Sequence, residues 1–310
     1  MILGLHHVTA TVDDARRDLG FFREALGLRL VKKTVNFDNK RVYHFYYGDE
    51  RGTPGTIWTT FPYRGHGVRQ GEKGAGQIGV TSFSVPAGFF GWWKRRLEER
   101  GVAAREAPPR FGEESLVFSD PSGLAIELVA TSRDHRVPWT GGGVGAETAI
   151  RGIHSVTMVV PEPARTLELM TGLLGFTLVD EAEARLRLAV RGDEPGRTIE
   201  VFSPSDAPPA VNGLGTVHHV AMTVETGDDQ LRLRGELVRM GLSVTEVLDR
   251  KYFRSIYFRE PGGVLFEAAT VRPGFTVDEE LPCLGQDLQL PVEDEPRREE
   301  IAAGLPPLTP

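Results

Sequence analysis

The sequence predicts an α+β protein made of four βαβββ modules, which form two paired-module domains with open, barrel-like mixed sheets. Three repeated features support this prediction. A His-His pair opens two similar strand-like runs, at His6-His7 and His218-His219. Two predicted helices end alike, in Leu-Gly-Leu at residues 26–28 and Leu-Gly-Phe at residues 174–176. A serine precedes a glutamate by 12 residues twice, at positions 115 and 127 and at positions 255 and 267. Such self-similarity indicates a repeated structural unit.

Each module reads as a strand, a helix and further strands. In the first helix, Leu19, Phe22 and Leu26 share one face after two acidic residues, and Gly27 ends the helix. Alternating apolar and polar residues predict the strands. We expect helices at residues 13–28, 90–100 and 230–240, and a further helix ending at residues 173–176. The expected strands include residues 5–12, 29–36, 41–47, 55–61, 78–85, 152–157, 177–181, 185–190, 198–202 and 218–224.

A segment rich in Gly and Pro, without a hydrophobic period, follows the second module and predicts a linker. We therefore expect an N-terminal domain at residues 1–135 (modules 1 and 2), a linker at 136–149, a C-terminal domain at 150–275 (modules 3 and 4) and a C-terminal extension at 276–310. One module cannot cover both faces of its own sheet. Paired modules can curl around a cavity, which is a natural ligand site.

The composition narrows the class of protein. The chain has 310 residues, 40% of them hydrophobic, and a formal net charge of -7 with both signs interspersed. This charge distribution does not predict a basic patch that would bind nucleic acid or an anionic membrane. The single cysteine, Cys283, excludes an intramolecular disulfide and a thiolate metal site. We see no targeting or membrane-spanning segment, and we expect a cytoplasmic protein.

The histidine pairs predict a metal site. Alignment of the opening strands places His7 and His219 at one position, where the other two modules have Val80 and Ser155. The closing strand of the fourth module adds Glu267. Two imidazoles and one carboxylate suit Fe(II) or Mn(II). Because neighbouring strand residues point to opposite faces, only one histidine of each pair can face the metal, and we assign His7 and His219 as ligands supported by His6 and His218.

The second and third modules are not expected to bind a metal. They offer Glu127, but Val80 and Ser155 stand where imidazoles would be needed. A carboxylate alone does not hold a divalent ion tightly. We therefore predict a metal-free relic cavity, in which Glu127 is salt-bridged or exposed.

Several segments carry a family resemblance. The repeats, residues 5–9 and residues 261–268 resemble the vicinal oxygen chelate superfamily, which includes glyoxalases, bleomycin resistance proteins and extradiol dioxygenases. Residues 43–50, 52–56, 274–279 and 284–288 look like those of its hydroquinone-type ring-cleaving dioxygenases. The resemblance implies a mononuclear Fe(II) site at His7, His219 and Glu267 that opens a small dihydroxylated aromatic ring with O₂. It also implies that Tyr257 is an acid, a base or a hydrogen-bond donor. Residues 249–255 look shorter than the matching loop, so no arginine contact is carried over.

Ring cleavage requires groups that accept and return a phenolic proton. We expect His218 and Tyr257 to do this, with His6 as a weaker candidate. Thr9 is on the same side of its strand as His7 and is a candidate for substrate binding. Packing roles for Thr9 and Tyr257 remain open, and no role is assigned to His44, His66 or His135. We also expect a homo-oligomer.

Two other functions remain open. A glyoxalase-like enzyme would use the metal only as a Lewis acid. Relatives of that kind generally use a fourth protein ligand, and we place Trp58 at the matching position of the first module. The other alternative is a non-enzymatic small-molecule binding protein on the same fold, for which a complete His/His/Glu set is not needed.

Overall fold

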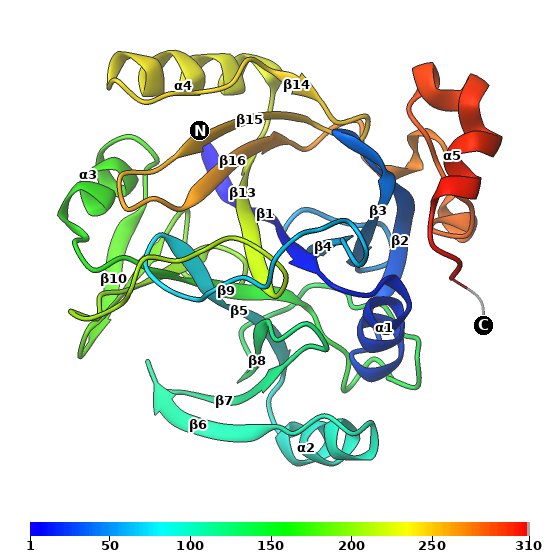
Figure 1. Ribbon diagram of the computed structural model, residues 1–310. Helices are drawn as coiled ribbons and strands as arrows, with labels where there is room; N and C mark the ends of the chain where they lie inside the picture. The colour runs from blue at the N-terminus through cyan, green and yellow to red at the C-terminus, as the bar shows by residue number, and fades with distance from the viewer. Residues whose placement is uncertain (309–310) are drawn as a thin grey trace.

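Four βαβββ modules follow one another in the computed structural model, which describes residues 1–308 (Figure 1). Their bounds are β1 (Ile2–Val12), α1 (Ala15–Gly20), β2 (Arg29–Asn36), β3 (Asn39–Gly48) and β4 (Ile57–Pro62); β5 (Gln77–Pro86), α2 (Phe90–Glu99), β6 (Arg105–Arg110), β7 (Glu113–Ser119) and β8 (Ala125–Thr131); β9 (Gly152–Val159), α3 (Ala164–Gly172), β10 (Thr177–Ala182), β11 (Arg185–Ala189) and β12 (Thr198–Phe202); β13 (Thr216–Val224), α4 (Gly227–Arg239), β14 (Leu248–Asp249), β15 (Arg254–Arg259) and β16 (Leu265–Thr270). The predicted α+β class is confirmed.

The strands form two eight-stranded mixed sheets. Their orders are β14-β15-β16-β13-β1-β4-β3-β2 and β10-β11-β12-β9-β5-β8-β7-β6. The opening strands pair antiparallel at the centre of each sheet, β1 with β13 and β5 with β9. Modules 1 and 4 therefore share one sheet, and modules 2 and 3 share the other. Each sheet contains strands from before and from after residues 136–149. The division of the chain into two domains at that linker stays a prediction.

The first helix shows how the local sequence sets an element's ends. The Arg17 backbone N–H donates to the Asp14 carboxylate at 2.8 Å, which caps the start of α1. A π-helical turn, Phe21–Ala25, continues the helix. Gly27 follows with a φ of 72°, and a Cβ at this position would lie 1.9 Å from a Val144 methyl carbon. Glycine is therefore needed here both for its backbone conformation and for its size.

The helices cover the outer faces of the sheets. Leu233 and Leu237 of α4, and Trp93 and Leu97 of α2, are fully buried. Helix α4 lies over β15, and α2 lies beside β6 at the opposite end of the molecule (Figure 1). The Trp93 indole N–H donates to the Thr148 carbonyl at 2.9 Å, so the predicted linker packs against the second module. No helix within residues 1–308 is long and apolar enough to cross a membrane.

The C-terminal extension packs against the sheet of modules 1 and 4. It begins within the short helical turn Phe275–Val277 and contains the turns Leu281–Cys283 and Val292–Arg297 and the helix α5 (Arg298–Gly304). Phe275 and Leu284 join one buried cluster with Tyr46 and Phe253. The fully buried Lys32 of β2 binds Asp278 at 2.6 Å and also pairs with Glu279. This segment therefore stabilises the wall of the cavity that the first sheet encloses.

Candidate metal centre and active site

Three adjacent strands bring one side chain each to a common point: His7 on β1, His219 on β13 and Glu267 on β16. All three side chains are buried. The distance from His7 Nε2 to His219 Nε2 is 3.3 Å. Glu267 Oε2 lies 3.2 Å from His7 Nε2 and 2.8 Å from His219 Nε2. The structure thus brings together the three residues that the sequence predicts as metal ligands.

The neighbouring histidines hold the rings of these ligands. His6 Nδ1 lies 2.9 Å from His7 Nδ1, and His218 Nδ1 lies 2.8 Å from His219 Nδ1. Burial, and then the nearby His7, lower the pKa of His6 to about 3, which keeps His6 neutral. If each ligand histidine donates its Nδ1–H to its neighbour, its Nε2 lone pair faces Glu267. This tautomer is the one that a metal requires.

Glu267 is a buried carboxylate with one oxygen left unsatisfied. The Ser255 hydroxyl donates to Oε1. Within residues 1–308, Oε2 has no aligned hydrogen-bond donor although two imidazole nitrogens lie close to it. Burial raises the pKa of Glu267, but attraction to His7 and the close approach of His219 outweigh it, so the pKa lies well below its usual range. An ionised, buried oxygen facing two imidazole nitrogens fits a divalent cation, and the donor set suits Fe(II) or Mn(II).

A cavity of about 400 Å³ opens above this cluster. Cavities of about 150 Å³ accommodate benzene, so this one has room for a substituted single ring. Its lining combines His7 and His219 with aromatic and polar side chains, among them Phe253, Arg250 and Tyr257. The Phe253 ring centre lies 5.2 Å from that of His7, so an apolar wall covers the cluster of His7, His219 and Glu267.

The predicted site residues occupy different places around the cavity. Thr9, His218 and Tyr257 line it. His6 is buried behind His7, with its ring centre 5.0 Å from that of Phe253, and it is absent from the lining. This position allows His6 to support His7 but separates it from a bound ring. The roles assigned to these residues stay predictions.

Two cavity residues were missed by the sequence analysis. The Arg250 Nε donates to the Tyr257 hydroxyl at 3.3 Å, in the loop for which no arginine contact was carried over from the family resemblance. His44 lines the cavity, and its Nε2 lies 2.9 Å from the Thr59 hydroxyl oxygen. Alternation along β3 places His44 and Tyr46 on one face, and both line the cavity. This alternation was the available signal for His44.

The assignment of Trp58 to the fourth-ligand position was wrong by one residue. In the first module Thr9 pairs with Thr59, and in the fourth module Ala221, two residues after His219, pairs with Glu267. Thr59 is therefore the counterpart of Glu267, and the buried Trp58 points to the other face of the strand. The fourth position carries a hydroxyl in place of a carboxylate. Thr59 thus differs from the carboxylate ligand expected of a glyoxalase-like site.

The second sheet has the corresponding positions with different side chains. Its register makes Glu127 and Glu200 counterparts, and both are fully buried. Arg110 binds both: its Nη1 lies 2.6 Å from Glu127 Oε1, and its Nε lies 3.1 Å from Glu200 Oε2. The prediction that Glu127 is salt-bridged is confirmed. A guanidinium cation therefore occupies the space between the two carboxylates and neutralises them.

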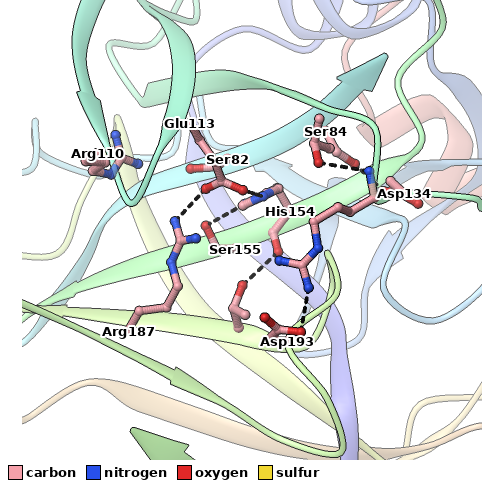
Figure 2. Close-up of polar contacts among 12 residues, drawn as sticks. Ser82, Ser84, Arg110, Glu113, Asp134, His154, Ser155, Arg187 and Asp193 are labelled. Atoms are coloured by element: carbon pink, nitrogen blue, oxygen red, sulfur yellow. Dashed lines mark hydrogen bonds and ion pairs between the residues drawn. The ribbon is translucent and has the colours of Figure 1, made fainter. Parts of the chain in front are cut away.

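The rest of this second cluster is also hydrogen-bonded (Figure 2). Glu113 accepts from His154 Nε2 at 3.0 Å and from Arg187 at 2.7 Å. The His154 Nδ1 lies 3.1 Å from the hydroxyl of Ser155, the counterpart of His7. Because each ligand position is replaced or neutralised, this cluster has no open cation site.

Comparisons with known proteins cover nearly the whole chain. The family model of the Glyoxalase/Bleomycin resistance protein/Dioxygenase superfamily matches residues 4–128 and 152–268. The chain is 43% identical to "Putative ring-cleaving dioxygenase MhqE" of Bacillus subtilis (strain 168), over 98% of this chain and 99% of that protein. It is 37% identical to the chlorohydroquinone/hydroquinone 1,2-dioxygenase of Sphingobium indicum, over 96% and 94% respectively. A crystal structure of a "putative dioxygenase" from Bacillus subtilis superposes with a TM-score of 0.94 and 41% identity, over 99% of this chain and 98% of that one.

Proposed function

The chain belongs to the Glyoxalase/Bleomycin resistance protein/Dioxygenase superfamily, and from this premise we propose that it is an Fe(II)-dependent ring-cleaving dioxygenase. Its substrates would be O₂ and a dihydroxylated aromatic of the hydroquinone or catechol type. The observation that carries the proposal is the buried Glu267 oxygen, which faces two imidazole nitrogens at the floor of a cavity sized for one aromatic ring. The names of its full-length relatives support the same activity.

His7, His219 and Glu267 would hold the iron. When bound there, Fe(II) supplies Lewis acidity toward a phenol and electrons for the reaction with O₂, and Mn(II) is the alternative ion. These three side chains would hold the ion at the floor of the cavity, and the cavity would hold the ring and O₂ together beside them. Holding two reactants together removes much of the entropy cost of their encounter.

The chain's own residues orient the ring and handle its protons. Burial raises the pKa of Tyr257, so this phenol stays protonated and can donate a hydrogen bond to a substrate oxygen. The Arg250 guanidinium holds the Tyr257 hydroxyl at 3.3 Å. His218 also lines the cavity, with its Nδ1 2.8 Å from His219 Nδ1; burial lowers the pKa of His218 to about 3, so its ring is neutral and would hold a substrate proton only transiently. Phe253 and Phe61 supply apolar walls that limit the access of water.

The experiment that tests the proposal is anaerobic reconstitution with Fe(II), followed by oxygen-electrode and ultraviolet assays on hydroquinones and catechols. His219→Ala removes one ligand, and His135→Ala, at an exposed position, is the matched control. We expect iron-dependent O₂ uptake with a ring-opened chromophore in the native protein and the control, and neither in His219→Ala. Tight metal binding without O₂ uptake would favour the glyoxalase-like alternative. Absence of metal binding would refute the site and leave a binding protein.

A further inference from the structure

A chain of three polar side chains crosses the cavity wall from β3 to β1. His44 Nε2 lies 2.9 Å from the Thr59 hydroxyl oxygen, and the Thr59 hydroxyl donates to that of Thr9 at 2.8 Å. Thr9 and His44 line the cavity, whereas Thr59 is fully buried between them. We propose that His44 is a positioning residue that acts through Thr59 to present the Thr9 hydroxyl as a hydrogen-bond donor to the aromatic substrate. This inference rests on the proposed function.

The proposal fixes one direction for this series of hydrogen bonds. With the Thr59 hydroxyl giving its single proton to Thr9, the Thr59 oxygen accepts from His44. Burial, and then the nearby His7 and His219, hold the pKa of His44 well below its usual range, so the ring is neutral and carries one N–H. That N–H is therefore on Nε2. Thr9 already accepts from Thr59, and its own proton has no acceptor within residues 1–308, which leaves that proton for a ligand in the cavity.

Packing keeps the first member of this chain in place. The His44 ring centre lies 4.0 Å from that of Tyr46 and 4.2 Å from that of Phe61. These contacts restrict rotation of the imidazole, so the Nε2–H is directed at Thr59. Restricting a donor before the ligand arrives lowers the entropy cost of binding. His44 therefore has the properties of a support for Thr9.

The place of Thr59 in the fold explains why a hydroxyl is found there. Thr59 is the counterpart of Glu267, at the position where a carboxylate would add a fourth ligand. Its hydroxyl instead bonds to Thr9 and His44, away from the three-ligand cluster. A carboxylate at this position would act as a fourth metal ligand. The Thr59 hydroxyl instead orients the Thr9 hydroxyl, which donates to the substrate.

The first test of this proposal needs neither metal nor substrate. Nitrogen-15 NMR of histidine-labelled, metal-free protein reports which ring nitrogen of His44 carries the proton, with His44→Gln used to assign the signal. We expect a neutral ring protonated on Nε2. A ring protonated on Nδ1 would overturn the proposed direction of the chain. Because this readout involves no catalysis, it separates failure of the inference from failure of the proposed function.

The second test measures binding of hydroquinone to the Fe(II)-loaded protein by anaerobic calorimetry. His44→Phe keeps a ring but loses the donor, and we expect a Kd about 5- to 10-fold higher, the usual effect of one hydrogen bond. His44→Gln retains a donor and should change Kd less than about threefold. In a Thr9→Val background, His44→Phe should have almost no further effect, because the acceptor of the chain is gone.

If His44→Phe raised the Kd for hydroquinone equally in the native and the Thr9→Val backgrounds, this result would refute the proposal that His44 acts through Thr9. Iron stoichiometry and the unfolding midpoint serve as controls, since a purely structural role would shift the midpoint in all three His44 and Thr9 variants. Native protein that binds iron but not hydroquinone would overturn the presentation of Thr9 to this substrate together with the proposed function.

Discussion

Arg110→Met should destabilise the protein by removing the cation from the second cluster. The guanidinium lies 2.6 Å from Glu127 and 3.1 Å from Glu200. Glu200 keeps Arg187 at 2.9 Å, whereas Glu127 keeps the Ser82 hydroxyl at 2.6 Å and, within residues 1–308, no other cation. The cost therefore comes mainly from one buried carboxylate without a counter-ion. Breaking such a pair typically costs about 3–5 kcal/mol of unfolding free energy.

The loss should depend on pH with a definite sign. In the native protein burial raises the pKa of Glu127, but the bond to Arg110 outweighs burial and lowers it. A carboxyl pKa that is lower in the folded than in the unfolded protein stabilises the fold at pH values above the unfolded pKa. This stabilisation is lost as pH falls through the folded pKa. Without Arg110 the Ser82 hydroxyl remains but the cation is lost, so burial dominates and raises the pKa of Glu127, and the ionised form destabilises the variant as pH rises. The deficit of Arg110→Met should therefore be largest near neutral pH and shrink toward pH 4.

Urea unfolding at pH 7.5 and pH 5 measures both effects. The double variant Arg110→Met/Glu127→Gln is the matched control, because it removes the charge that Arg110 neutralises, and we expect it to regain most of the lost stability. A loss below about 1 kcal/mol, or the same loss at both pH values, would refute the reasoning that Arg110 replaces a metal ion as the buried counter-charge.

Three further predictions concern the metal site, a titrating carboxyl and the C-terminal extension. Ser255→Ala should weaken Fe(II) affinity about 10- to 100-fold, because the hydroxyl holds the second oxygen of Glu267; metal titration checks this, and unchanged affinity would contradict it. Burial raises the pKa of Asp18 to about 7 despite bonds from Thr60 and Tyr47, so this group's contribution to stability should fall by up to about 1.4 kcal/mol per pH unit as pH rises from about 4 to 7. Asp18→Asn should flatten that part of the stability-pH curve, and an unchanged curve would count against the assignment. Lys32→Met leaves Glu279 without its buried cation, while Asp278 keeps Lys251 at 2.7 Å, and should cost about 3–5 kcal/mol in urea unfolding, whereas Lys33→Met should be nearly neutral.

The residue pattern was sufficient for the modules and for the three clustered side chains. Alternation along a strand restricts each His-His pair to one inward residue, and the repeat singles out His7 and His219. The structure places both within 3.3 Å of each other and of Glu267. The family resemblance inferred from residues 5–9 and 261–268 is confirmed by the family match. These features were predictable because they depend on local periodicity and on repetition along the chain.

The tertiary structure decided which strands became neighbours and which loops reached the cavity. Strand register moved the fourth-ligand position from Trp58 to Thr59, a shift of one residue that reverses the face of the strand. His44 and Arg250 entered the site only because β3 and the loop before β15 fold over it. Arg110 reaches two glutamates that are 17 and 90 residues away in the chain. The sequence by itself determined the modules and the three side chains that cluster, because these follow from periodicity and repetition; contacts between distant segments depend on pairing and packing, which the tertiary structure alone decides.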